Sequence, residues 1–188
     1  GRRIQIAWMA GGKYPDMPFN QQMSFPCELT LRTTPEGIRL YRQPVNEIMR
    51  LYQKEYQWND QTIKPGENLL SDISGDLFDI NAEIELGNAK EIEFIVHGEK
   101  IRYNASESLI SLLDRSAYLP PINKKIKLRV LLDRSSIEIF GNDGQVSMSF
   151  CFLPDSENNG LGIHAIGGEA YLISMNIYKL TSAWLGSG

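Results

Sequence analysis

The chain has 188 residues, of which 42% are hydrophobic and 22% are charged, and its formal net charge is −4. This composition is typical of a globular protein with its own core and excludes a disordered chain. The acidic balance without a Lys/Arg run argues against nucleic acid as a partner, no apolar run approaches the ~18 residues of a membrane span, and the first residues lack the apolar stretch of a signal peptide.

Short alternating apolar segments separated by turn residues begin at the start of the chain. Residues 3–9 alternate, and residues 28–32 alternate again. Residues 34–37, with the sequence Thr-Pro-Glu-Gly, then turn the chain into residues 38–41, which is the signature of a β-hairpin. Such alternation predicts strands with one buried face.

One segment has helical spacing instead. Pro44 suits the first turn of a helix, and the apolar residues that follow fall at helical intervals: Val45, Ile48, Leu51 and Tyr52. We expect a short helix over residues 44–55, the only one in the chain. A polar connection over residues 59–68, which contains Pro65-Gly66, would follow it.

Further strands are predicted in the second half of the chain: residues 78–86, 91–96, 126–132, 136–140, 145–152 and 170–180. Asn142-Asp143-Gly144 is a strong tight-turn signal between two of them. The Gly pairs at 160/162 and 167/168 bracket one more short strand. Residues 104–123 form the longest irregular segment, in which we expect one short strand and then a loop packed on a sheet edge.

These elements predict the fold class. Eight or more short antiparallel strands with short connections form a sandwich or a barrel, and we favour an antiparallel β-sandwich of the jelly-roll or lectin-like type with one short linker helix. No internal repeat indicates an intact propeller or solenoid.

Acidic residues were considered first as candidate catalytic groups. Asp60 follows an aromatic residue in Trp58-Asn59-Asp60, and Glu28 follows Cys27 at the start of a strand. Glycoside hydrolysis needs two carboxyl groups about 5 Å apart or wider, and the sequence holds no second carboxylate near either one. We therefore interpret Trp58 as a packed side chain and Glu28 as a strand-end charge.

The most distinctive stretch is residues 133–140, Asp-Arg-Ser-Ser-Ile-Glu-Ile-Phe. Asp133 and Arg134 suit the turn before a strand. Alternation then places Ile137 and Ile139 in the core and Glu138 in solvent. We expect a hairpin turning at residues 142–144, with Glu138 exposed.

The sequence gives little support for a metal site or a disulfide. His97 and His164 are isolated and no Cys-x-x-Cys occurs, so no zinc site is expected. Cys27 and Cys151 are interpreted as buried free thiols, with a disulfide between them left open. No catalytic, cofactor-binding or metal-binding residue is predicted.

Exposed aromatic residues on a sheet can bind sugar rings. The sequence offers five candidates, which form no stripe along it: Tyr41, Trp58, Tyr103, Tyr118 and Trp184. A stand-alone carbohydrate-binding, lectin-like sandwich and a dimerisation module both remain open as alternatives.

Several stretches resemble glycoside hydrolase family 32, which contains invertases, levanases and inulinases. Residues 1–9 and 18–32, with Pro-Phe-Asn-Gln-Gln-Met-Ser-Phe-Pro, resemble the end of its catalytic domain, although Cys27 stands where the family commonly has Arg. Residues 40–48 resemble its interdomain connection, and residues 131–144 resemble the signature of its C-terminal sandwich. The resemblance spans essentially the whole chain.

The resemblance implies an N-terminal five-bladed β-propeller that holds the active site and a retaining mechanism with two carboxyl groups. The family's three acidic motifs, Asn-Asp-Pro-Asn, Glu-Cys and Arg-Asp-Pro, do not occur here, because Asp60 is followed by Gln61 and Cys27-Glu28 has the reverse order. No catalytic role is carried over to this chain.

The resemblance also implies a domain organisation and a function. Residues 1–43 would be the last strands of a truncated propeller, 44–58 a linker helix, 59–184 the sandwich and 185–188 a flexible tail. The chain would be the non-catalytic C-terminal module of a β-fructosidase acting on levan, inulin or sucrose. Its partner would be the propeller of the same protein, with fructan or a second copy as further partners, and its location extracellular or periplasmic. Trp8, Phe19 or Phe25 should lie against the sandwich or another chain.

Overall fold

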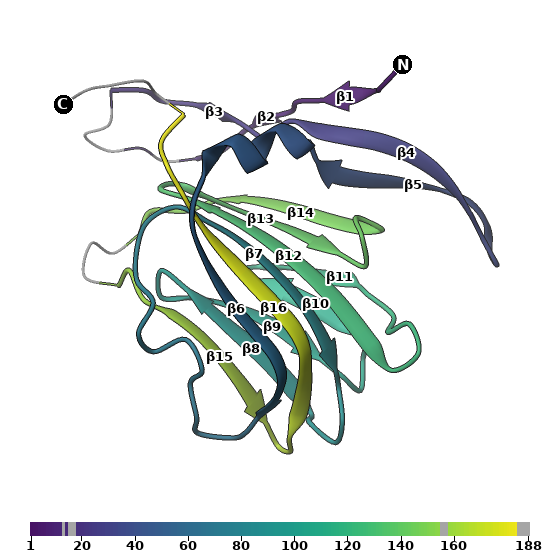
Figure 1. Cartoon of the computed structure of the whole chain (residues 1–188). Coiled ribbons are helices and arrows are strands. Elements are labelled where there is room, and N and C mark those ends of the chain that lie inside the picture. The colour runs from purple at the N-terminus through teal and green to yellow at the C-terminus, as the bar shows by residue number, and fades with distance from the viewer. Residues whose placement is uncertain (13, 15–17, 155–157, 184–188) are drawn as a thin grey trace.

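The computed structural model describes residues 1–12, 14, 18–154 and 158–183. Figure 1 shows two stacked antiparallel sheets with an N-terminal segment lying across one end of them. The all-β sandwich with one short helix predicted from the sequence is confirmed. Trp184 and the expected tail, residues 185–188, lie outside the described residues. Among the helices that the structure describes, none is long and apolar enough to cross a membrane.

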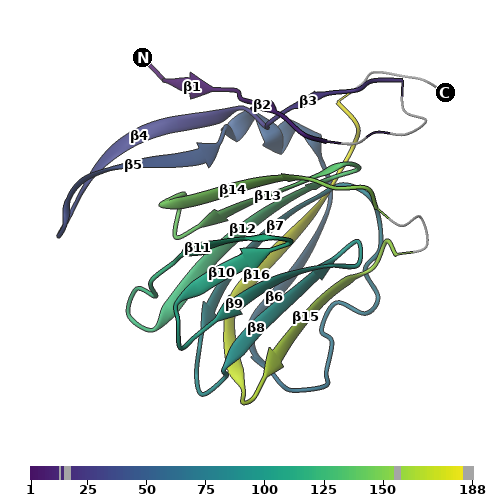
Figure 2. The same cartoon turned by 180° about the vertical axis from the view of Figure 1, so that it is seen from behind.

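One layer is a five-stranded sheet in the order β11-β10-β9-β8-β15, which faces the viewer in Figure 2. Its strands are β8 (Glu91–Val96), β9 (Glu99–Asn104), β10 (Leu109–Leu112), β11 (Arg115–Tyr118) and β15 (Leu161–Ile166). Consecutive strands pair through tight turns, such as His97-Gly98, where both residues have positive φ.

The other layer is a six-stranded sheet in the order β14-β13-β12-β7-β16-β6. Its strands are β6 (Tyr52–Ile63), β7 (Phe78–Glu85), β12 (Lys125–Asp133), β13 (Ser136–Gly141), β14 (Val146–Cys151) and β16 (Ala170–Leu180). Asn142, Asp143 and Gly144 all have positive φ in the turn from β13 to β14, as the turn signal predicts.

The core lies between the two sheets. Alternate residues of the six-stranded sheet, such as Ile80, Val130 and Ile139, point inward and pack against residues such as Phe94 and Ile163 of the five-stranded sheet. Burying an aliphatic side chain of this size contributes about 1.5–3 kcal/mol, so the regular alternation that predicted the strands also accounts for the stability of the sandwich.

The N-terminal arm, residues 1–45, forms two small sheets outside the sandwich. Its strands are β1 (Ile4–Gln5), β2 (Trp8–Met9), β3 (Gln22–Met23), β4 (Cys27–Thr34) and β5 (Gly37–Pro44). β4 and β5 form the predicted hairpin, which projects beyond the sandwich in Figure 1. β1 pairs with β4 in antiparallel orientation, outside the two sheets of the sandwich.

The helix is shorter than predicted. The structure has a 3₁₀ helix, η1 (Asn46–Leu51), and residues 52–58, expected as helix and linker, begin the long strand β6. Helical spacing misled here because Ile48 packs in a buried cluster with Cys27 of the arm, while Tyr52 already belongs to the sheet. Asp60 adds to the difficulty, since its φ of +53° interrupts the alternation of β6.

The second half of the chain follows the prediction closely, with β8 and β16 at the predicted bounds. Two differences remain. The segment over residues 104–123 holds two strands, β10 and β11, rather than one, and β9 was not predicted. These strands lie toward the edge of the five-stranded sheet, where only one face is buried and fewer apolar residues are needed.

Candidate functional site

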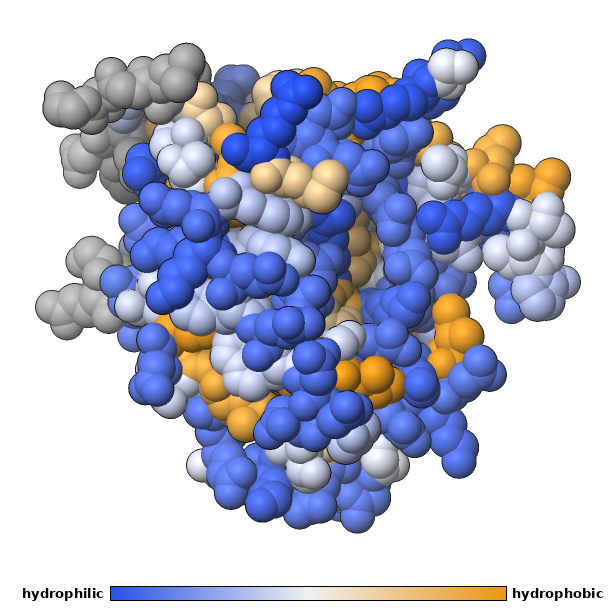
Figure 3. All heavy atoms as spheres, in the orientation of Figure 1, coloured by the Kyte–Doolittle hydropathy of each residue, from blue (hydrophilic) through white to orange (hydrophobic). Residues whose placement is uncertain are grey.

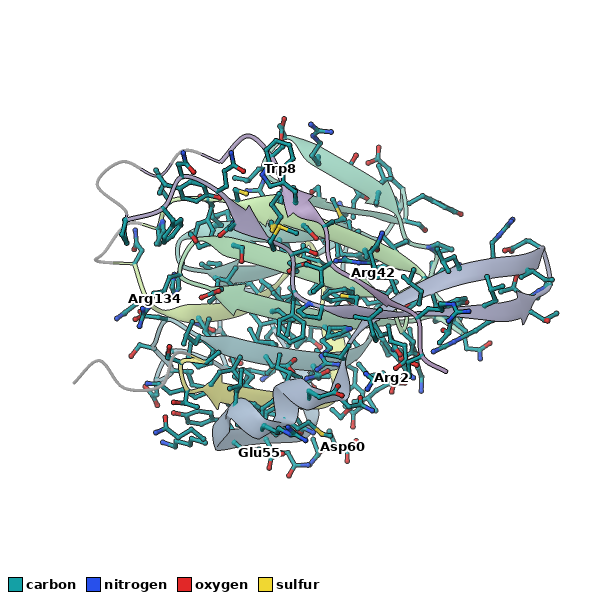
Figure 4. All side chains as sticks on the ribbon, turned by 90° about the horizontal axis from the view of Figure 1, so that it is seen from above. Arg2, Trp8, Arg42, Glu55, Asp60 and Arg134 are labelled. Atoms are coloured by element: carbon teal, nitrogen blue, oxygen red, sulfur yellow. The ribbon has the colours of Figure 1, made fainter. Side chains whose placement is uncertain are left out.

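The region richest in buried polar groups is the junction where the N-terminal arm covers the outer face of the six-stranded sheet. Because residues alternate along a strand, the residues of β7, β12, β13 and β14 that do not point into the core point toward this junction. Leu131, Glu138 and Ser149 are cross-strand neighbours there, on three adjacent strands. Figure 4 looks down on this face, with Arg42 of the arm over it.

Glu138 is the polar centre of the junction. Its carboxylate accepts a hydrogen bond from the backbone N–H of Phe25 at 2.5 Å, from the Ser149 hydroxyl at 2.7 Å and from the Arg42 guanidinium at 3.3 Å. The side chain of Glu138 is 4% exposed and that of Arg42 is 13% exposed. A buried carboxylate is tolerated when it is paired and fully hydrogen-bonded, so this group ties β13 to two segments of the arm.

The prediction that Glu138 is exposed is therefore wrong, whereas Ile137 and Ile139 are buried in the core as expected. Alternation correctly placed Glu138 on the opposite face from the two isoleucines. It could not show that this face is covered by residues more than 90 positions away in the chain. The polar donors around Glu138 give no support to a paired-carboxylate catalytic site.

Backbone contacts bring the arm close to the sandwich beside Glu138. The N–H of Arg42 donates to the carbonyl of Gly144 at 3.0 Å, and a Cβ at position 144 would collide with the Arg42 carbonyl. The guanidinium of Arg42 also lies 5.5 Å from the ring centroid of Phe140. Gly144 thus serves both the tight turn and the close approach of the arm.

A second buried carboxylate, Asp79, lies on β7, and Leu131 of β12 separates it from Glu138 in the sheet. Arg129 donates to it twice, at 2.9 and 2.6 Å, and the Tyr52 hydroxyl and the Asn81 amide donate at 2.7 and 2.9 Å. Burial opposes the charge of Arg129, but its hydrogen bonds to Asp79 outweigh this and raise its pKa. Burial and the bond to Asp79 also raise the pKa of Tyr52. Tyr52 stacks on Tyr178 with ring centroids 3.9 Å apart.

A third contact joins β3 to the start of β13. The Gln22 amide donates to the carbonyl of Ser135 at 3.0 Å and to the Cys151 sulfur at 3.2 Å, and the Ser135 hydroxyl donates back to Gln22 at 2.8 Å. Cys151 and Cys27 are both free thiols in the structure, so they do not form a disulfide.

A small apolar cluster completes the junction. Cys27, Ile48, Leu131 and Phe140 are buried there, and Phe25 packs against them. Burial raises the pKa of the Cys27 thiol to about 11. Of the three aromatic residues expected to lie against the sandwich, Phe25 does so, whereas Trp8 and Phe19 are exposed.

The acidic residues weighed as catalytic candidates do not come together. Asp60 lies on the exposed edge strand β6, where it accepts a hydrogen bond from Tyr171 at 3.1 Å. Glu28 lies on β4 and pairs with Arg2 at 3.0 Å. Figure 4 places Asp60 and Trp8 on opposite sides of the molecule. Asp133 caps the turn before β13 by accepting from the N–H of Arg134, as predicted.

The aromatic candidates are dispersed as well. Tyr103 is buried in the core and donates to the carbonyl of Leu119 at 3.0 Å, and Trp58 packs against the core beside Tyr56. Tyr41 is buried in the arm and Tyr118 is exposed on β11. Within the part of the chain that the structure describes, no group of three or more His, Cys, Asp and Glu side chains could hold a metal ion.

The junction was missed by sequence reasoning, although one signal was available. Glu138 sits between two core isoleucines in the most distinctive stretch of the chain. Gln22 and Arg42 lie in residues 18–32 and 40–48, two of the stretches that carry the family resemblance. These three side chains meet at the junction. The charges and amides of the junction bond across the contact between the arm and the sheet.

Comparison with known sequences extends over nearly the whole chain. The levanase of Bacillus subtilis (strain 168) is 34% identical over 212 residues, which cover 97% of this chain and 31% of the levanase. The extracellular exo-inulinase of Aspergillus awamori is 22% identical over 212 residues, covering 96% of this chain and 39% of that protein. The chain therefore spans about a third of the length of these relatives.

Solved structures show the same fold. The exo-inulinase of Aspergillus awamori superposes with a TM-score of 0.81 at 19% identity, over 96% of this chain and 41% of that one. Fructan 1-exohydrolase IIa of Cichorium intybus gives a TM-score of 0.81 at 18% identity, over 97% and 46%. The family model described as "Glycosyl hydrolases family 32 C terminal" matches residues 47–179.

Proposed function

Because the chain belongs to glycoside hydrolase family 32 and matches its C-terminal domain, we propose that it is the non-catalytic module of a fructan-hydrolysing β-fructosidase. Its role is to hold and support a propeller-type catalytic domain of the same protein. Residues 1–43 are the last strands of that propeller, and the active site lies in the part of the protein that the relatives have in addition.

The junction is the observation that carries this proposal. Glu138 and Gln22 form polar contacts with the other side of the junction that a stand-alone sandwich would not need. Glu138 bonds to Phe25 and Arg42, and Gln22 bonds to Ser135, so each contact orders a particular part of the arm. Polar networks of this kind favour one arrangement over others. A sandwich that fixes the position of the arm supports whatever domain the arm belongs to.

The arm itself presents apolar surface. Of the described residues, eight of the fifteen exposed large hydrophobic side chains belong to it: Ile4, Ile6, Trp8, Phe19, Met23, Leu31, Ile38 and Leu40. Figure 3 shows apolar side chains gathered on the projecting hairpin. Exposed apolar patches mark interaction sites, and strands with free edges are suited to pairing with further strands. Both features support a neighbouring domain as the partner.

The substrate class follows from the relatives. Levanase and exo-inulinase are names of fructan-degrading enzymes, so levan, inulin or sucrose is the substrate of the whole protein. Its mechanism is retaining, with a carboxylate nucleophile and a carboxylic acid supplied by the propeller. An extracellular or periplasmic location agrees with the extracellular relative.

The first test is hydrolysis by the chain alone. The purified 188-residue chain is incubated with sucrose, inulin and levan, and released fructose is measured against a buffer blank. We expect no release, because the acidic candidates Asp60 and Glu28 lie apart and each is bonded to a side chain other than a carboxylate, whereas glycoside hydrolysis needs two carboxyl groups held around one bond. Release that survives repurification and disappears in Asp60→Asn or Glu28→Gln would contradict the proposal.

The second test concerns support. In a longer protein that includes the preceding domain, Glu138→Gln should lower the temperature of half-inactivation by several degrees, as expected for about 1–3 kcal/mol of lost stability. The Michaelis constant should stay unchanged. Glu36→Gln, on the exposed turn between β4 and β5, is the matched control and should leave both unchanged. A Glu138→Gln enzyme as heat-stable as the control would contradict the supporting role.

A further inference from the structure

A groove crosses the outer face of the six-stranded sheet next to the junction. It has a volume of about 220 Å³, and its lining includes Pro44 at the end of β5 and Gly144 in the turn between β13 and β14. Its floor is formed by side chains of β7, β12 and β16 that point away from the core. The groove is therefore walled by the arm on one side and by the turn on the other, and both walls are held by the contact between Arg42 and Gly144.

Strand register brings the polar residues of the floor into two neighbouring rows. Asn176 of β16 pairs with Asn81 of β7, which pairs with Arg129 of β12. In the next row on the same face, Ser174 pairs with Glu83, which pairs with Lys127. The rows place two amides and a hydroxyl side by side, with charged groups at their ends.

The charges along the groove already have partners. Arg129 is held by Asp79 at 2.6 Å, Lys127 lies 3.3 Å from Asp143, and Glu83 lies 3.9 Å from Lys125. An ionic ligand would have to displace one of these partners. The groove is thus suited to a neutral molecule.

The amides, in contrast, have bonding capacity left. Among the described residues, Oδ1 of Asn176 is buried without a hydrogen-bond partner, and its amide nitrogen has one contact, 3.5 Å from the Tyr178 hydroxyl. An unsatisfied buried acceptor costs about 1–3 kcal/mol. Asn176 lines the groove, and the broad terminal torsion of Asn lets its amide exchange partners at little cost. Ser174 has no side-chain hydrogen bond in the described part of the chain and lines the same floor.

We propose that this groove binds one ring of a neutral saccharide. Amides and hydroxyls offer donors and acceptors together, and sugar hydroxyls are donors and acceptors as well. The lining also includes apolar residues, among them Pro44 and Phe140. The volume is below the roughly 300–1,000 Å³ of sites for drug-sized ligands, so it fits one ring rather than a long segment of a polymer.

This inference does not depend on the supporting role proposed above. A scaffold without sugar binding and a sugar-binding module without a scaffold role are each possible outcomes. The groove differs from the aromatic stacking face considered from the sequence, because it uses amide side chains rather than exposed aromatic rings.

The test is an NMR titration of the ¹⁵N-labelled 188-residue chain with fructose, 1-kestose, glucose and maltotriose, and with glycerol as the polyol control. For at least one saccharide we expect saturable shifts centred on Asn81, Ser174 and Asn176, with a dissociation constant in the millimolar range, near −4 kcal/mol. Glycerol should give no saturable shift. Comparing the fructose-based with the glucose-based sugars shows which ring the groove accepts.

Variants locate the site. Asn176→Ala and Ser174→Ala should each weaken binding about five-fold or more while leaving the thermal unfolding midpoint nearly unchanged. Gln57→Ala is the matched control, because Gln57 pairs with Asn176 in the same row but does not line the groove, and it should bind like the unaltered chain. Shifts that do not saturate, that glycerol reproduces, that centre elsewhere, or that persist in Asn176→Ala would overturn the proposal.

Discussion

The two faces of the six-stranded sheet are built by the same strands but depend on different chemistry. On β13, Ile137 and Ile139 face the core, whereas Glu138 and Phe140 face the arm, and all four are buried. The inner face needs apolar side chains of suitable volume. The outer face needs donors and acceptors in particular positions, because a buried carboxylate is tolerated only when its partners are in place.

This difference shows that the burial of a residue does not by itself say which interactions stabilise its face of the sheet. Substitution on the inner face should weaken the whole sandwich, because its residues belong to one continuous core. Substitution of an outer-face residue that bonds to the arm, such as Glu138, should release the arm before the sandwich unfolds. The following variants test that contrast, from the largest expected effect to the smallest.

The largest effect is expected on the inner face. Ile139→Ala removes a fully buried side chain and should cost about 2–5 kcal/mol of unfolding free energy, since deleting buried methyl groups leaves a cavity. Urea denaturation measures the loss, and limited trypsin digestion should show the arm still protected under native conditions. A loss below 1 kcal/mol would mean that the core repacks around the site.

Asp79→Ala should cost nearly as much, although Asp79 lies on the outer face. The change leaves Arg129, Tyr52 and Asn81 without their shared acceptor. Breaking a buried pair costs about 3–5 kcal/mol, and we expect the lower end because the Arg129 side chain is 22% exposed and regains some water. Urea denaturation with Asp114→Ala, on an exposed turn, as control checks this; equal stability of the two variants would contradict it.

Glu138→Gln should have a smaller and more local effect. The amide keeps one oxygen for the Phe25 N–H but loses the charge that pairs with Arg42, so about 1–3 kcal/mol is expected. Trypsin cleavage after Arg32 or Arg39 and faster hydrogen exchange in the arm should appear before any change in the sandwich. If cleavage stays as slow as in Glu36→Gln, the carboxylate does not hold the arm.

Alkaline pH should weaken the junction modestly. Burial raises the pKa of Cys27 to about 11, and burial with the bond to Asp79 raises that of Tyr52 above its ordinary value near 10. In the unfolded chain the thiol ionises near 8.5, so the contribution of a raised pKa is fully present below that pH and is lost as pH rises toward 11.

Urea unfolding at several pH values between 8 and 11 measures this loss. The decline of unfolding free energy with pH should be shallower in Cys27→Ala, and shallower still when Tyr52→Phe is added. The same dependence in all three proteins would mean that other groups are responsible.

The sequence alone predicted the sandwich and most of its strands because these depend on local patterns. β8 and β16 alternate regularly, and Asn142-Asp143-Gly144 combines the residue types that tolerate positive φ in a tight turn. The resemblance of residues 131–144 to a family signature also needed no structure. The helix over residues 44–55 was predicted too long, because a few apolar residues at helical spacing cannot be told from a loop that enters an edge strand.

What the sequence determined is thus which face of each strand a residue occupies, since alternation is a property of the backbone. What only the tertiary structure decided is what covers that face. Glu138 was placed on the correct side of β13 and in the wrong environment, because Arg42 and the N–H of Phe25 reach it from distant segments. Asp79 and Arg129 became an ion pair for the same reason: pairing across strands depends on register, and register is set by the packed sheet rather than by either segment alone.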